Sequence, residues 1–254
     1  MRRFIVALIF VAGPAAARVP DIAALESMVV ESTNRFRAEE GRAAVAPERH
    51  LEAAAREFAA FMARTDRYGH TADGREPADR AKAHGYDYCL VSENISYQYS
   101  SLGFRTGELA TRLVDGWKKS PGHRRNMLDE GATHTAVAVA HSGATGRYYA
   151  VQLFGRPRSQ QVRFRVRNEA GVQVRYRIGE QDFTLGPRET HTHERCARET
   201  LRLEGRTRGP EPRQGEDYTI ARVKGDLVIN TSRASSRAPP PRPPAPPSRA
   251  TPPA

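Results

Sequence analysis

Two histidines and one glutamate in the first half of this chain have side chains suited to chemistry. They are His70, Glu93 and His123. Neutral imidazoles are good ligands for zinc or copper, and a nearby carboxylate can orient one ring and raise its pKa. Two histidines alone do not hold a metal tightly, so Glu93, water or a bound ligand would have to complete the shell. The alternative is that both histidines only cap loops or hydrogen-bond to them, and the residue types alone favour that alternative.

Nucleophilic catalysis has less support in the sequence. The chain contains no Gly-x-Ser-x-Gly motif, which would place a serine on the sharp turn of an α/β-hydrolase. Cys89 lies four residues before Glu93, and its neighbours give no sign of a lowered thiol pKa. Ser120 and Asn126 lie near His123 in the sequence, but such neighbours are common where helices begin.

The two cysteines of the chain are Cys89 and Cys196. In an oxidising compartment this pair predicts one disulfide, which would join a first module to a second one. Closing a loop of about 100 residues stabilises a protein by up to roughly 4–5 kcal/mol in the chain-entropy model. A metal site is the rival interpretation, because His191 and His193 precede Cys196 and would lie on one face of a strand. We expect the disulfide.

Helices must position the candidate residues in the first module. Apolar residues at helical spacing predict two amphipathic helices within residues 21–66. Gly41 interrupts the pattern, and Pro47 restarts it at a first-turn position. A short helix is expected to follow Glu76-Pro77 and to stop at Gly85.

The next helix is predicted over residues 106–119, with Trp117 on its apolar face. Ser120 and Pro121 then have the residue types preferred at the N-cap and first position of another helix. His123 would lie in the first turn of that helix, where a side chain can reach a cleft.

After this helix the spacing of apolar residues changes from that of a helix to the alternation of a strand. Residues 133–142 and 147–154 read as two strands joined by a Ser-Gly-Ala-Thr-Gly turn. In the first strand Val137 and Val139 would face one way and the intervening alanines the other. The small alanine face suits close packing of a helix on the sheet. Helices followed by a hairpin predict a layered α/β domain that ends near Gly155.

From Val162 onward, strict alternation of apolar and charged residues predicts a small all-β module. Val162, Phe164 and Val166 would face inward, and the strand after the turn at residues 168–171 would repeat the pattern from Val172. Further short strands are expected around residues 183–185, 201–203, 218–223 and 227–229.

Arginines occupy the outward positions of these strands. They are Arg163, Arg165, Arg167, Arg175 and Arg177. Such a row could bind an anionic envelope polymer such as lipopolysaccharide phosphate or an acidic polysaccharide. A solvated sheet face is the plainer interpretation, and the sequence favours it.

The N-terminus has the composition of an export signal. Arg2 and Arg3 precede the apolar stretch at residues 4–12, and small alanines follow at residues 15–17. This order predicts a secretory signal peptide cleaved after Ala17, and therefore a secreted or periplasmic protein. A buried N-terminal helix is the less favoured alternative. No apolar run approaches the roughly 20 residues that a membrane-spanning helix needs.

The C-terminus has the composition of a disordered tail. Residues 239–253 contain nine of the chain's 18 prolines and no aromatic residue. The net charge of +11 is spread along the chain, and no folded segment carries enough of it to predict a specific nucleic-acid module.

The ordered motifs of the first module resemble the CAP superfamily, which groups cysteine-rich secretory proteins, antigen 5 and pathogenesis-related proteins. The resemblance is strongest to its bacterial extracellular branch and covers about residues 21–156. It rests on motifs in this order: Asn34-Arg35, His70, Gly85-Tyr86, Glu93-Asn94-Ile95, Trp117, Ser120-Pro121-Gly122-His123-Arg124, Asn126-Met127-Leu128 and Tyr149–Gly155.

The resemblance implies an α+β fold in which an α-β-α sandwich carries a cleft with two histidines and two glutamates. His70, Glu93 and His123 match the first histidine, the first glutamate and the second histidine, and the histidine pair is the implied metal site. Arg112 stands where the family has its second glutamate, and Glu108 lies one helical turn earlier. A cation at that position should weaken metal binding and favour an anionic ligand.

These observations predict four segments: a signal peptide at 1–17, a CAP-like domain at 18–158, a small β domain at 159–232 and a disordered Pro/Arg-rich tail at 233–254. The first functional hypothesis is a cleft that binds a small lipidic, anionic or peptide ligand through His70, Glu93, His123, Asn94, Glu108 and Arg112. A divalent metal, most plausibly zinc, could be held by His70 and His123.

The second hypothesis is a metal-assisted hydrolase in which Glu93 acts as general base. The third is a cell-envelope interaction protein that acts through the β module and the tail. The residues alone do not decide whether the protein is an enzyme.

Overall fold

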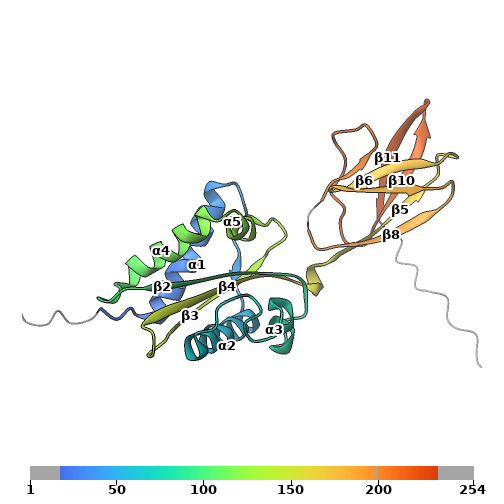
Figure 1. The fold of residues 1–254 in the computed structure, drawn as a ribbon. Helices are drawn as coiled ribbons and strands as arrows, with labels where there is room; N and C mark the ends of the chain where they lie inside the picture. The colour runs from blue at the N-terminus through green and yellow to red at the C-terminus, as the bar shows by residue number, and fades with distance from the viewer. Residues whose placement is uncertain (1–17, 198, 234–254) are drawn as a thin grey trace, which may run out of the picture. The chain divides into compact units, whose positions relative to one another are not determined.

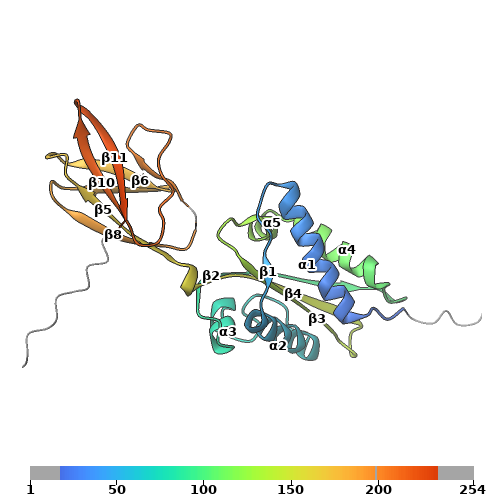
Figure 2. The same ribbon diagram turned by 180° about the vertical axis from the view of Figure 1, so that it is seen from behind.

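The computed structural model describes residues 18–197 and 199–233. They form two compact units, shown in Figures 1 and 2. The first unit comprises the residues up to Val162 together with Glu194–Glu199, and the second comprises Arg163–His193 with the residues from Thr200 onward. The expected signal peptide at 1–17 and residues 234–254 of the expected tail lie outside the described residues. No helix within the described ranges is long and apolar enough to cross a membrane.

The described residues of the first unit form five α-helices and one four-stranded sheet. The helices are α1 (Ile22–Glu39), α2 (Arg49–Thr65), α3 (Pro77–Ala83), α4 (Thr106–Lys119) and α5 (Pro121–Leu128). The strands are β1 (Ala46–Pro47), β2 (Tyr88–Tyr99), β3 (His134–His141) and β4 (Arg147–Pro157), and a 3-10 turn, η1 (Arg158–Gln160), follows β4. The sheet has the order β1-β3-β4-β2, so the expected hairpin of β3 and β4 forms its centre.

Helices cover both faces of this sheet, as Figure 1 shows: α1, α4 and α5 lie on one side and α2 and α3 on the other. Val137 and Val139 of β3 belong to the core on the α1/α4 side, together with Trp117. Ala136 and Ala138 belong to the core against α2, because their small side chains let the helix approach closely. The predicted α+β fold with an α-β-α sandwich is confirmed.

The start of α2 differs from the prediction at Pro47. This proline lies in β1, which pairs in parallel with β3, and the helix begins at Arg49 with Glu48 as its N-cap. The amide of Ala46 donates to the carbonyl of Thr133, just before β3, at 2.9 Å, and that of Glu48 donates to Thr135 of β3 at 3.0 Å. Proline suits such an edge position because its missing N–H leaves no ladder hydrogen bond unmade.

The second unit contains two small sheets. Its strands are β5 (Val162–Asn168), β6 (Val174–Ile178), β7 (Gln181–Leu185), β8 (Thr190–Arg195), β9 (Leu201–Leu203), β10 (Glu216–Val223) and β11 (Asp226–Arg233). One sheet has the order β11-β10-β5-β8 and the other has the order β7-β6-β9. The alternation is confirmed from Phe164 onward, since Phe164 and Val166 of β5 and the inward side chains of β6 are buried, whereas Val162 is only partly buried.

The segment between β5 and β6 differs from the prediction. Val172 is 42% exposed, and β6 begins only at Val174. The two strands also join different sheets. The buried Asn168 side chain fixes the crossing, since its amide nitrogen lies 2.7 Å from the Val172 carbonyl oxygen and 3.0 Å from that of Leu185.

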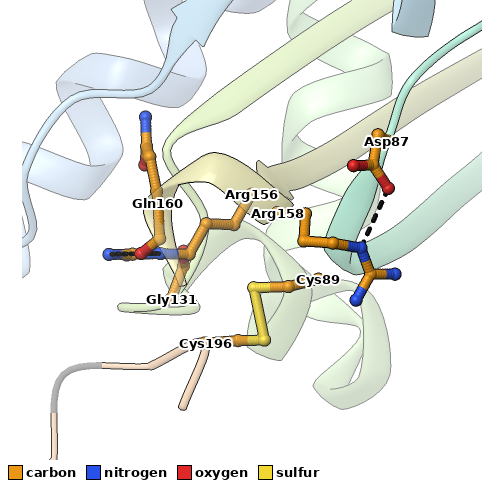
Figure 3. The surroundings of a disulfide bond; sticks show 7 residues. All are labelled: Asp87, Cys89, Gly131, Arg156, Arg158, Gln160 and Cys196. Atoms are coloured by element: carbon orange, nitrogen blue, oxygen red, sulfur yellow. Dashed lines mark hydrogen bonds and ion pairs between the residues drawn. A yellow bond between two sulfur atoms is a disulfide. The ribbon is translucent and has the colours of Figure 1, made fainter. Parts of the chain in front are cut away.

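A disulfide joins Cys89 to Cys196, as predicted, and links residues that are 107 positions apart. Cys89 lies in β2, and Cys196 lies in the short segment Glu194–Glu199 that belongs to the first unit. The bond therefore closes within that unit instead of joining it to the second. Figure 3 shows its surroundings, where Arg158 donates to Asp87 at 2.9 Å and Arg156 lies close to Gly131.

Candidate functional site

The loop that carries His70 is anchored at the end of α2. Asp66 closes this helix in the left-handed conformation, with φ of 54°. Its carboxylate accepts hydrogen bonds from Tyr149 of β4 and, at 2.8 Å, from Arg147. The sheet therefore fixes the point from which the chain turns toward His70.

Glu93 of β2 holds the His70 ring in place. Its carboxylate Oε1 lies 2.8 Å from Nδ1 of His70, and only 1% of the Glu93 side chain is exposed, whereas the His70 side chain is 49% exposed. A carboxylate accepts a hydrogen bond, so this contact requires a proton on Nδ1 and sets the tautomer of the neutral ring. The other nitrogen, Nε2, makes no hydrogen bond within the described chain.

Arg80 of α3 balances the buried carboxylate. It is completely buried, and its Nη2 donates to Oε2 of Glu93 at 2.7 Å and to the carbonyl of His70 at 3.0 Å. A second guanidinium nitrogen, Nη1, donates to Asp73 at 2.9 Å, and the guanidinium lies 3.5 Å from the ring centroid of Phe58. A buried charge is tolerated only when it is paired and hydrogen-bonded, and Arg80 meets that condition for Glu93.

His123 lies in the first turn of α5, as predicted, and faces His70. The ring centroids of the two histidines are 6.5 Å apart. Burial lowers the pKa of His123 below its ordinary value of 6.5, and the neighbouring His70 lowers it further. The ring is therefore neutral at pH 7. Neither of its nitrogens makes a hydrogen bond within the described chain.

Two asparagines join the strand of Glu93 to the helix of His123. Asn94 is fully buried and donates to the carbonyl of His123 at 3.2 Å. Asn126 donates to the side chain of Asn94 at 2.9 Å and to the carbonyl of Glu93 at 3.0 Å. These contacts fix the separation between the two imidazoles.

Glu108 and Arg112 do not join this group. They pair with each other at 3.1 Å on the exposed side of α4, and the Arg112 guanidinium lies 5.5 Å from the ring of Phe104. Within the described residues, neither contacts His70, Glu93 or His123. Their expected part in ligand binding stays a prediction.

The donor set does not fit a resident divalent metal. Catalytic zinc usually has three protein ligands and structural zinc has four, and the site offers only two imidazoles. Both oxygens of Glu93, the third candidate, are already taken by His70 and Arg80. Across the described ranges there is no group of three or more His, Cys, Asp or Glu side chains arranged to hold a metal ion.

The sequence did not reveal Arg80 and gave Asn126 no role. Arg80 follows Asp79 in a short helix, and nothing in its spacing links it to a carboxylate 13 residues later. The only usable signal is physical: a buried glutamate needs a cation or hydrogen-bond donors.

Two hollows lie away from these histidines. One, of about 490 Å³, lies between α1, α2 and β3, and the other, of about 550 Å³, lies on the β7-β6-β9 sheet.

Comparisons with known proteins agree with the first unit alone. Residues 30–154 match the model of the cysteine-rich secretory protein family, CAP. The protein YkwD of Bacillus subtilis strain 168, itself described as uncharacterized, is 31% identical over 124 residues. That match covers 48% of this chain and 45% of YkwD, so the chain spans less than half of this relative.

Solved structures of low sequence identity also match. An outer surface protein of Borrelia burgdorferi is 17% identical, covers 52% of this chain and 92% of its own, and has a TM-score of 0.46. An extracellular SCP-domain protein of Bacillus anthracis is 22% identical, covers 53% of this chain and 41% of its own, and has a TM-score of 0.45. The family match, taken with the sandwich and its ordered motifs, identifies the first unit as a CAP domain of bacterial type.

Proposed function

We propose that this chain is an extracytoplasmic CAP-domain protein whose His70–Glu93–His123 site binds the carboxylate group of a small ligand, either a fatty acid or a peptide. One observation carries the proposal. Two facing imidazoles offer three ring nitrogens that have no partner among the described residues, and one of these rings is fixed by a buried carboxylate that is itself held by a buried arginine. Such support is typical of a site whose geometry matters.

The chemistry of the two rings suits an anion. Glu93 keeps a proton on Nδ1 of His70, so protonation of the ring adds a second donor at Nε2. A carboxylate placed between the rings would accept a hydrogen bond from the N–H of His123, and would accept one from Nε2 of His70 only when the His70 ring is protonated. Because a ligand anion offsets the repulsion between the two cations, binding should strengthen as the pH falls through the lowered pKa of His123.

Glu93 acts in this proposal as a positioning residue. Both of its oxygens are engaged and its side chain is 1% exposed, so it is poorly placed to take a proton from water. The metal-assisted hydrolase is therefore less well supported than ligand binding.

Export is the second part of the proposal. The N-terminal residues have the order of a signal peptide, and the Bacillus anthracis relative is described as extracellular. Mass spectrometry of the exported chain should find an N-terminus at Arg18. An intact Met1 on the exported protein would contradict cleavage.

The binding test uses octanoate and an acidic tripeptide as probes, with the His70→Ala and His123→Ala variants. His141→Gln is the matched control, because His141 is exposed at the far end of β3. Losing one charge-assisted hydrogen bond should weaken binding about tenfold in each site variant and leave the control unchanged. Calorimetry at pH 5.5 and pH 8 measures the affinities, and mass spectrometry checks that the tripeptide is not cleaved.

Two results would contradict this proposal. One is equal affinity for both probes in the wild type and the two site variants. The other is cleavage of the tripeptide that depends on His70 and His123, which would favour the hydrolase instead.

A further inference from the structure

The second unit has a hollow of about 550 Å³ on the β7-β6-β9 sheet. The charged residues among its lining are mostly arginines: Arg175, Arg177, Arg202 and Arg206, with Asp182 and Glu204. The lining therefore carries an excess of two positive charges. We call this set the arginine hollow.

Strand register brings two of these arginines directly opposite each other. Arg177 of β6 pairs in the ladder with Asp182 of β7 on one side and with Arg202 of β9 on the other. Directly opposed residues of an antiparallel pair share one face, and like charges there are destabilising. Glu180 lies 3.9 Å from both guanidinium groups, but its side chain is 91% exposed, so water screens this compensation strongly.

Arginines on both strands have carboxylate partners, those of β6 being Glu204 for Arg175 and Asp182 for Arg177, so the strands differ only in the charge balance of their hollows. Arg165 is held by Asp217 through a hydrogen bond of 2.7 Å, and Arg167 lies 3.2 Å from Glu169. A smaller hollow of about 260 Å³ on that strand has Arg163 and Arg165 matched by two carboxylates, those of Glu216 and Asp217. The outward arginines of the sequence are thus divided between two sheets, and of these two hollows only the one on β6 has an excess of positive charge.

We propose that the arginine hollow binds an acidic polysaccharide through carboxylate or sulfate groups. Neighbouring strands lie about 5 Å apart, and Arg175 and Arg177 are separated by roughly 7 Å along β6. Two arginines on one strand and one on the next therefore present a grid of donors to a ligand with repeated negative charges.

The same face lacks what a single-stranded nucleic acid needs. Binding of unpaired bases relies on exposed aromatic rings. Tyr176 and Phe183 stack on each other with ring centroids 5.3 Å apart, and Tyr176 is 1% exposed. Both residues border the hollow, but their positions alternate with those of the outward arginines, so their rings point to the opposite face of the sheet. Thr184 and Thr207 line the hollow and can supply hydroxyl groups to a sugar.

Asp182 occupies part of the site in the free protein. It accepts two hydrogen bonds from Arg177, at 2.7 and 2.8 Å, and its side chain is 72% exposed. Exposed ion pairs contribute little to stability, so a polyanion can replace this carboxylate. Asp182→Asn removes the competing charge and should tighten binding without any loss of positive charge.

The test uses the full chain at physiological salt, with polygalacturonate as the carboxylate probe and a heparin oligosaccharide as the sulfate probe. The site variant is Arg177→Gln with Arg202→Gln. The control is Arg163→Gln with Arg167→Gln, which removes the same charge from exposed positions of β5. We expect a loss of about tenfold or more for at least one probe in the site variant and little change in the control. Whichever probe responds identifies the anionic group.

Two results would overturn the proposal: equal weakening by the two double variants, which indicates only general electrostatic attraction, or failure of the wild type to bind either probe. Thermal unfolding of each variant shows whether its fold is kept. If the site variant does not fold, Asp182→Asn decides, because unchanged or weaker binding by that variant also overturns the proposal.

Discussion

Replacing Arg80 with methionine should destabilise the first unit severely. The side chain is fully buried and pairs with two carboxylates, Glu93 at 1% exposure and Asp73 at 5%. Methionine fills much of the volume but leaves the buried Glu93 without its arginine, whereas Asp73 keeps its ion pair with Arg75. Breaking a buried ion pair by removing one partner typically costs about 3–5 kcal/mol, and Arg80→Met should fall in that range.

Urea unfolding followed by tryptophan fluorescence measures this cost. The chain's single tryptophan, Trp117, is buried in the core of the first unit, so its emission reports that unit alone. Arg112→Met is the matched control, because Arg112 is 56% exposed and forms its ion pair with Glu108 on the same helix. The control should change the unfolding free energy by less than about 0.5 kcal/mol.

A double-mutant cycle separates the ion pair from the packing. Glu93→Gln in the Arg80→Met background removes the carboxylate charge that has lost its arginine, so it should cost less than Glu93→Gln alone. The reasoning is refuted if Arg80→Met unfolds at the wild-type urea concentration, or if the two substitutions are simply additive.

Three further predictions concern the disulfide, zinc and pH. Thiol titration of the denatured, unreduced chain should find no free thiol, and two free thiols would exclude the disulfide. Replacing both cysteines, in Cys89→Ala with Cys196→Ala, should lower the free energy of unfolding by up to about 4–5 kcal/mol. After dialysis against zinc the protein should keep no stoichiometric metal. Zinc that the wild type retains, and that a variant with both His70 and His123 replaced does not, would contradict this prediction. Because the pKa of His123 is lowered in the folded state, this histidine's contribution to the free energy of unfolding should be complete above about pH 6.5 and should be lost as the pH drops through the pKa of the folded state. The loss of stability with falling pH should be smaller in His123→Gln. Equal slopes of unfolding free energy against pH in the two proteins would contradict this prediction.

The helices and the central hairpin could be predicted because their signals are local. Residues 106–119 show a helical apolar stripe that ends at Trp117, and α4 spans Thr106–Lys119. Alternation in β3 separates the alanine face from the valine face, and each face packs against a different core. His123 could be placed because serine followed by proline is a common way for a helix to begin.

Long-range pairing could not be predicted in the same way. Alternation shows which side chains of β5 and β6 are buried, but not that the two strands join different sheets. Arg80 contacts Glu93 only because α3 packs beside β2, and the sequence carries no spacing rule for that contact. Cys196 lies between strands of the second unit in the sequence, yet its segment groups with the first unit because the disulfide fixes it to β2.

The pKa of His123 in the wild type and in His70→Ala tests the central claim that the two imidazoles share one site. Ring proton shifts followed by NMR against pH give the value in each protein. The pKa should lie below 6.5 in the wild type and should rise in His70→Ala, because the neighbouring ring contributes to the lowering. An identical pKa in both proteins would mean that the two histidines do not interact, and the proposed ligand site would then be untenable.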